Sequence, residues 1–87
     1  MSSVIKISEN EKKLKKILSD LLKIDVNEIT NQTSSKDIEA WDSFNTLNIV
    51  VEVENEFGIV INLEELVTLK TFLDLKNILR SKNIEFK

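Results

Sequence analysis

Apolar residues recur at helical spacing in the first part of the chain. The segment Ser8–Glu11 has the Ser-x-x-Glu form of a capping box, and apolar residues then follow at i, i+3, i+4, i+7 and i+8: Leu14, Ile17, Leu18, Leu21 and Leu22. This pattern predicts an amphipathic helix from residue 9. The lysines at 12, 13, 15 and 16 occupy its other faces. Because no aromatic residue or Arg accompanies them, we interpret them as a solvated face rather than a nucleic-acid or membrane patch.

Residues 24–41 lose this periodicity. Polar residues dominate, and we expect the apolar residues between them to tuck into the core: Ile24, Val26, Ile29 and Ile38. The segment is longer than most loops of compact domains, and such loops are often functional. It ends at Trp41, the only tryptophan, which we interpret as a packing anchor rather than a ligand contact.

A second helical pattern runs from Ser43 to Phe57. At roughly 100° per residue, one broad arc is apolar and is expected to be mostly buried: Phe44, Leu47, Ile49, Val50, Val51, Val53 and Phe57. The opposite arc is polar and is expected to face water or a partner: Asn45, Asn48, Glu52, Asn55 and Glu56. The valines would also suit a strand, but the length of the segment and Gly58, a typical helix stop, favour a helix.

The last third predicts one short and one longer helix. Residues 58–61 would suit a strand, but no second strand is evident, so we expect a connecting loop with Ile61 buried. Asn62 can cap a short helix whose inward residues are Leu63, Leu66 and Leu69. Thr71 and Asp74 open a last helix that buries Phe72, Leu75, Ile78 and Leu79. The expected fold is all-α, a small four-helix bundle of three longer helices and one short helix, with a long loop between helices 1 and 2.

The composition supports one small helical domain. Eighty-seven residues suffice for a single domain, 1–87, with a core at about 9–82, and one Gly with no Pro favours helices over a turn-rich sandwich. With 41% apolar and 31% charged residues, the chain can form both a core and a solvated shell. There is no Cys, no apolar stretch of signal length in Met1–Ser8 and no membrane-spanning segment. We therefore expect a cytoplasmic monomer that does not bind a membrane.

Charge is segregated along the sequence. Residues 24–66 contain ten acidic residues and only one basic residue, Lys36, whereas the segments on either side are net positive. This acidic block is centred on residue 43. It repels nucleic acid and would steer a basic protein partner, although a solvated acidic face without a partner gives the same pattern.

The chemistry available to the chain is limited. Without His or Cys there is no His-activated nucleophile and no thiolate, and with one Gly there is no Gly-rich phosphate loop. No segment has the spacing of a helical calcium site, so we expect no metal site and no enzymatic activity. Ser43 directly opens the second helix, where unpaired amides favour an anion such as a phosphate. The alternative is that Ser43 and Asp42 only cap the helix.

The run Asp37–Phe44, followed by Leu47 and then Glu54–Ile59, resembles the centre of an acyl carrier protein. In that family an Asp-Ser-Leu motif opens the second helix and a Glu-rich stretch ending in Glu-Phe closes it. The similarity covers roughly residues 9–80 and includes the Thr71-Phe72 entry to the last helix. Phe44 stands where the family usually has Leu.

The resemblance implies that a phosphopantetheinyl transferase attaches 4′-phosphopantetheine from coenzyme A to Ser43, with Asp42 helping the enzyme to recognise the site. The terminal thiol would carry acyl groups as thioesters. The second helix would dock on partner enzymes, namely an acyl-loading ligase or acyltransferase and condensing or transfer enzymes. A groove between the second and third helices would shelter the cargo, unless its residues simply fill the core: Leu47, Val51, Ile61, Leu66 and Leu69.

The polar arc departs from the family pattern. Asn45, Asn48 and Asn55 stand where carriers of fatty acid biosynthesis are commonly acidic, so the resemblance points to a specialised carrier rather than the housekeeping one. Polyketide or other secondary metabolism, polysaccharide modification and aminoacyl transfer are candidate pathways. The rival interpretation is a helical interaction domain with no prosthetic group, in which Ser43 is only a cap and the acidic block binds a basic protein.

Overall fold

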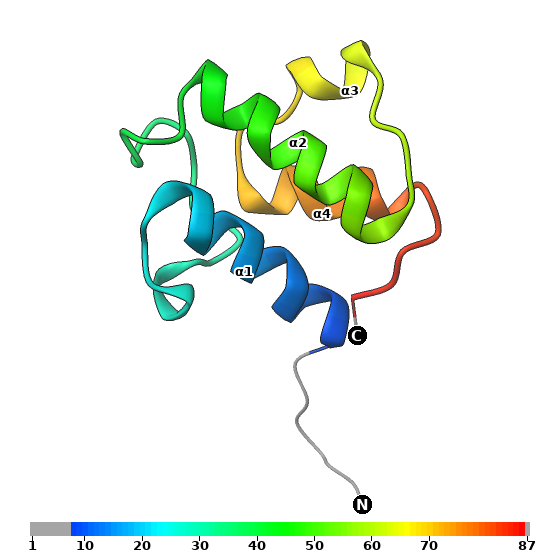
Figure 1. The fold of residues 1–87 in the computed structure, drawn as a ribbon, viewed down its shortest axis with the longest axis horizontal. Helices are drawn as coiled ribbons and strands as arrows, with labels where there is room; N and C mark the ends of the chain where they lie inside the picture. The colour runs from blue at the N-terminus through cyan, green and yellow to red at the C-terminus, as the bar shows by residue number, and fades with distance from the viewer. Residues whose placement is uncertain (1–7, 87) are drawn as a thin grey trace, which may run out of the picture.

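A computed structural model describes residues 8–86, which form four α-helices and one short 3₁₀ helix. In chain order these are α1 (Glu9–Leu22), η1 (Val26–Glu28), α2 (Ser43–Phe57), α3 (Leu63–Val67) and α4 (Phe72–Arg80). In Figure 1, α2 crosses the centre of the molecule, with α1 on one side, α3 on the other and α4 behind it. The expected all-α fold of three longer helices and one short helix is confirmed, whereas the expected domain 1–87 also includes residues 1–7 and 87, which lie outside the described range.

The helix ends follow the sequence signals. Asn62 and Thr71 form complete capping boxes with Glu65 and Asp74, at the starts of α3 and α4. At α1 only half of the predicted box is seen, because Ser8 Oγ accepts a hydrogen bond from the Glu11 amide (3.0 Å) while the Glu11 carboxylate is occupied by lysines. Helix α2 ends at Gly58, whose positive φ of 65° is a left-handed conformation that Gly adopts without steric cost.

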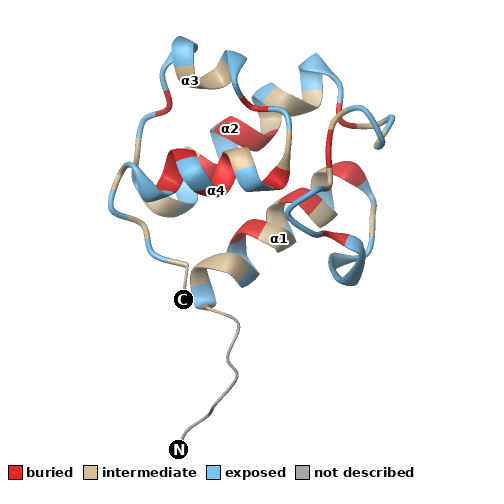
Figure 2. Ribbon diagram, turned by 180° about the vertical axis from the view of Figure 1, so that it is seen from behind, coloured by how far each residue is buried: buried red, intermediate tan, exposed pale blue. Residues whose placement is uncertain are grey.

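The core lies where α1, α2 and α4 meet, and Figure 2 shows buried residues on each of these three helices. The apolar spacing of α1 and α4 is confirmed, since Leu14, Leu18 and the four predicted residues of α4 are buried. Ile61 is also buried in the loop before α3. Two expectations are wrong, because Val26 is 40% exposed and Leu63 is 72% exposed. Both lie on a helix of five residues or fewer, too short to bury a full face.

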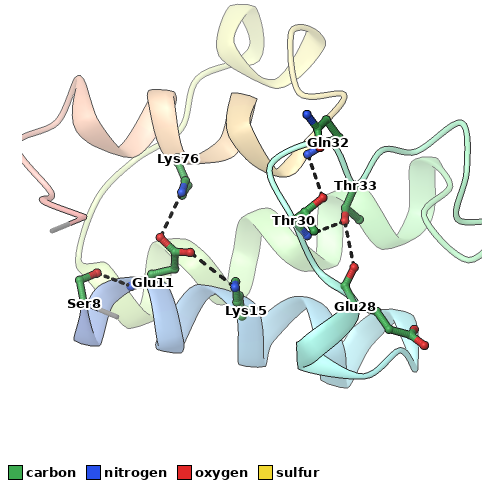
Figure 3. Close-up of polar contacts among 8 residues, drawn as sticks. All are labelled: Ser8, Glu11, Lys15, Glu28, Thr30, Gln32, Thr33 and Lys76. Atoms are coloured by element: carbon green, nitrogen blue, oxygen red, sulfur yellow. Dashed lines mark hydrogen bonds and ion pairs between the residues drawn. The ribbon is translucent and has the colours of Figure 1, made fainter. Parts of the chain in front are cut away.

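Residues 23–42 form an ordered loop that is tied to the start of α4. Thr33 Oγ1 accepts from the Thr30 amide and donates to the Glu28 carbonyl, which closes a turn inside the loop (Figure 3). Backbone bonds then join the loop to the α4 entry, from Phe72 N to Thr33 O (2.9 Å) and from Ser35 N to Lys70 O (3.0 Å). The loop therefore brings residues 33–35 next to residues 70–72. In the described part of the chain, no helix is long and apolar enough to cross a membrane.

Candidate attachment site at the start of helix α2

Asp42 and Ser43 have different positions at the start of α2. Asp42 is the N-cap, with extended backbone angles, and its Oδ1 accepts from the Asn45 amide at 2.9 Å. Ser43 is the first residue of the helix and is exposed. Its hydroxyl makes none of the hydrogen bonds found among residues 8–86. The interpretation of Ser43 as the helix cap is therefore wrong, and its hydroxyl is available for chemistry.

Trp41 anchors this turn in the core. Its side chain is 2% exposed, which confirms the prediction of a packing anchor. The Nε1 atom, however, is buried without a hydrogen-bond partner among the described residues. A buried donor without an acceptor is uncommon and costs about 1–3 kcal/mol. The indole therefore fixes in the core the residue that directly precedes Asp42 and Ser43.

Two asparagines of the predicted docking arc hold the same turn. Asn45 Nδ2 donates to the Ala40 carbonyl (2.8 Å), and Asn48 Nδ2 donates to Asn45 Oδ1 (3.1 Å). Both side chains are half-buried, so they do not point freely to solvent as the wheel suggested. The other members of the arc, Glu52, Asn55 and Glu56, are exposed, and Glu56 forms an ion pair with Lys13 at 3.5 Å.

The apolar arc of α2 is only partly buried. Ile49, Val50 and Val53 face the core as predicted, and Phe57 is half-buried. Phe44 is 71% exposed, while Leu47 and Val51 are each 52% exposed, so the expectation that they are buried is wrong. The residues at 44, 47 and 51 are spaced by three and four, so they form one apolar stripe on the outer side of the helix that begins beside Ser43.

An open hollow of about 690 Å³ adjoins Ser43. It is lined by residues of α2, of α3 and of the segments before α2 and α4: Ser35, Trp41, Asp42, Ser43, Thr46, Leu47, Leu66, Val67, Leu69 and Lys70. Three residues of the predicted acyl groove, Leu47, Leu66 and Leu69, are thus brought together. Val51 and Ile61 do not line the hollow, because Val51 faces outward and Ile61 packs into the core.

Sequence reasoning missed Lys70 and Thr46 as members of this site. Lys70 is 27 positions from Ser43, and backbone bonds between the loop before α2 and the α4 entry, such as that from Ser35 N to Lys70 O, bring it to the site. Near Lys70 the sequence signal is the capping pair of Thr71 and Asp74. This pair shows where α4 begins but does not show which residues of other segments lie beside Lys70. The site therefore combines an exposed hydroxyl, a hollow with apolar side chains in its lining, and one lysine.

Comparison with known proteins agrees with this geometry. Residues 12–79 match the protein family described as phosphopantetheine attachment site, so the chain is of the class that carries this prosthetic group. It is 36% identical over 73 residues to the acyl carrier protein of Buchnera aphidicola subsp. Schizaphis graminum (strain Sg), covering 84% of this chain and 92% of that protein. It is also 36% identical over 70 residues to the acyl carrier protein of Petrotoga mobilis (strain DSM 10674 / SJ95), covering 80% and 82%. The chain belongs to the acyl carrier protein family.

Family membership implies a covalently attached 4′-phosphopantetheine and partner enzymes that attach the arm and handle acyl groups. The residues at the start of α2 fit this group, because the exposed Ser43 hydroxyl makes no hydrogen bond among residues 8–86 and stands beside a hollow whose lining includes Leu47, Leu66 and Leu69. Without its own Cys, the chain obtains a thiol only from such an arm. The interpretation as an interaction domain without a prosthetic group is not supported.

Proposed function

We propose that the protein carries acyl intermediates as thioesters on a 4′-phosphopantetheine arm attached to Ser43. The observation that carries this proposal is the position of Ser43, exposed on the first turn of α2 with its hydroxyl unused, because Asp42 supplies the cap. When attached, the arm supplies the terminal thiol to which an acyl group is esterified. The phosphopantetheinyl transferase provides the attachment chemistry, so the chain acts as its substrate and needs no catalytic residue of its own.

The other site residues position the hydroxyl. Asp42 holds the first turn of α2 in place through the Asn45 amide, and Asn45 in turn holds the Ala40 carbonyl. Trp41 fixes the preceding residue in the core. Leu47, Leu66 and Leu69 offer an apolar wall beside Ser43 that can exclude water from a bound acyl chain. We propose that Asp42 also contributes to recognition by the transferase.

Attachment is tested by intact mass. The protein is incubated with coenzyme A, Mg²⁺ and a broad-specificity phosphopantetheinyl transferase, and we expect it to gain the mass of one phosphopantetheinyl group. Proteolysis followed by tandem mass spectrometry is expected to locate the group on Ser43. A chain that gains no mass while a housekeeping carrier in the same assay is fully converted would contradict the proposal.

We infer further that the carrier is a specialised one that serves its own set of partner enzymes. The outer side of α2 presents an apolar stripe, Phe44, Leu47 and Val51, and α3 adds exposed Leu63 and Val67. Within α2 the exposed acidic residues are Glu52 and Glu56. Glu56 forms an ion pair with Lys13. Docking is therefore expected to depend more on apolar contact than on charge.

Housekeeping fatty acid synthase enzymes test this second inference. With the holo protein as substrate, we expect kcat/KM at least about tenfold below that of a housekeeping carrier, because long-range steering by acidic residues is weaker. The variant Asn55→Glu, which adds an acidic residue at an exposed position of α2, is expected to recover part of the loss at low salt. Turnover equal to that of the housekeeping carrier would contradict a specialised role.

A further inference from the structure

We propose that Lys70 binds the phosphodiester that joins the arm to Ser43 and so holds the arm along the hollow between α2 and α3. This inference rests on the proposed function, since it concerns the group attached to Ser43. Lys70 is then a positioning residue for the arm. It would set the fraction of time that the arm lies against the protein rather than extending into solvent.

The backbone of Lys70 is held firmly beside the site. Its amide donates to Asp74 Oδ2 at 3.0 Å, and its carbonyl accepts from the Ser35 amide at 3.0 Å. Ser35 lines the same hollow as Lys70 and Ser43. The side chain is exposed, and its ammonium lies 3.4 Å from the Val67 carbonyl, which is a weak contact at the end of α3. A fixed backbone with a loosely held ammonium allows the charge to reach an anion at the rim.

The charges around Ser43 make this cation significant. Among the residues that line the hollow, Lys70 is the only basic one, and Asp42 is the only acidic one. The sequence segment 24–66 contains Lys36 as its single basic residue. Attaching a phosphodiester to Ser43 adds a negative charge at the start of α2, where the helix amides favour it but the adjacent Asp42 repels it, and a nearby cation offsets that repulsion. A hydrogen bond from an ammonium to a phosphate oxygen is short and charge-assisted, and Lys70 can supply it.

The rest of the lining gives the arm apolar contacts. Trp41 is 2% exposed and forms a fixed part of the wall of the hollow. The side chains of Leu66, Val67 and Leu69 line the hollow beside Lys70. Lys70 therefore supplies the charged contact at the phosphodiester, and the apolar side chains contact the less polar remainder of the arm.

The test compares where the arm lies in three proteins: the wild type, Lys70→Gln and the matched control Lys36→Gln. Each is isotope-labelled, converted to the holo form with unlabelled coenzyme A, and checked by intact mass. Isotope-filtered nuclear Overhauser effects are then measured between the methyl protons of the arm and the methyl groups of Leu66 and Leu69. Trp41 fluorescence before and after attachment gives a second readout of the arm.

In the wild type we expect clear Overhauser effects and a change in Trp41 emission on attachment. Lys70→Gln is expected to reduce the Overhauser effects about two- to fivefold, the range for one exposed ion pair, and Lys70→Arg is expected to preserve them. Lys36→Gln is expected to leave them unchanged, and about 0.5 M NaCl is expected to bring the wild type toward Lys70→Gln.

Several results would overturn the assignment of Lys70. These are Overhauser effects that are absent in the wild type, equal in Lys70→Gln and wild type, or equally reduced in Lys36→Gln. Failure of the proposed function has a different signature, because the wild type would then gain no mass at all. Since Lys70 is exposed, the amide spectrum of apo Lys70→Gln is expected to match the wild type and to exclude misfolding.

Discussion

Ser43→Ala is expected to abolish attachment of the phosphopantetheinyl group while leaving the fold intact. The substitution removes the proposed attachment oxygen, so intact mass after incubation with coenzyme A and a transferase is expected to show no increment. Stability is expected to change by less than about 0.5 kcal/mol, because Ser43 is exposed and its hydroxyl makes no hydrogen bond among the described residues. The melting temperature by circular dichroism measures this second part.

Asp42→Ala is the matched comparison, since it changes the adjacent residue. It is expected to lower stability but to retain attachment. Loss of the bond from the Asn45 amide to Asp42 Oδ1 is expected to cost about 1 kcal/mol of folding free energy. Attachment is expected to be slower but still to reach one group per chain. If Ser43→Ala were modified, or if it were destabilised as much as Asp42→Ala, the separation of cap and attachment site would be wrong.

The second large effect is expected at Glu11 and Lys76, which join α1 to α4. The Lys76 side chain is buried, and its ammonium lies 3.0 Å from Glu11 Oε1, while Lys15 lies 3.5 Å from Glu11 Oε2 (Figure 3). The ring of Phe72 is 5.4 Å from the same ammonium. Glu11→Gln leaves a buried cation without its counter-charge, so we expect unfolding free energy at pH 7 to fall by about 1–3 kcal/mol.

This loss is expected to depend on pH. Burial of Glu11 raises the pKa of its carboxyl, but the hydrogen bond and charge of Lys76, together with Lys15, outweigh burial and hold that pKa below its usual value of 4.5. A carboxyl whose pKa is lowered by folding stabilises the protein above its unfolded-state pKa, and the contribution is lost as pH falls through the lowered folded-state pKa. The difference in unfolding free energy between wild type and Glu11→Gln is therefore expected to be at its full size at pH 7. It is expected to become smaller as pH falls below the usual carboxyl pKa of 4.5.

Urea unfolding followed by Trp41 fluorescence gives the unfolding free energy of the wild type and of Glu11→Gln from pH 7 to below pH 4.5. Glu9→Gln is the control, because Glu9 lies on the same turn of α1 but its ion pair with Lys12 is 3.8 Å long and exposed. We expect that control to lose less than about 0.5 kcal/mol at pH 7. Equal losses of unfolding free energy in Glu11→Gln and Glu9→Gln would show that the buried pair of Glu11 and Lys76 stabilises the fold no more than an exposed ion pair does.

The local elements of this fold were predictable from the sequence because their signals lie within a few residues. Capping pairs at Asn62 and Thr71, apolar spacing in α1 and α4, and the stop at Gly58 each depend on contacts inside one helix turn. The identity of Ser43 as the candidate attachment residue was reached in the same way. The chain has no Cys or His, and the residues around Ser43 resemble one known family.

The predicted burial of Phe44, Leu47, Val51 and Leu63 failed for a different reason. A helical wheel tells which residues share a face, but a neighbour must cover that face for it to be buried. Helix α3 has five residues and covers only part of α2, so the stripe beginning at Phe44 remains outside. The half-burial of Asn45 and Asn48 likewise depends on the turn at Ala40, which no periodicity describes.

The sequence by itself determined the helices, the N-caps of α1, α3 and α4, and the serine that opens α2, because these properties depend on residues close together in the chain. Only the tertiary structure decided that Asp42 is the cap, that Lys76 is buried against Glu11, and that Lys70 and Trp41 share a hollow with Ser43. Each of these pairings depends on how helices and loops pack against one another. Packing depends on the whole chain, because many side chains from distant segments are buried against one another at once, so no short segment determines it.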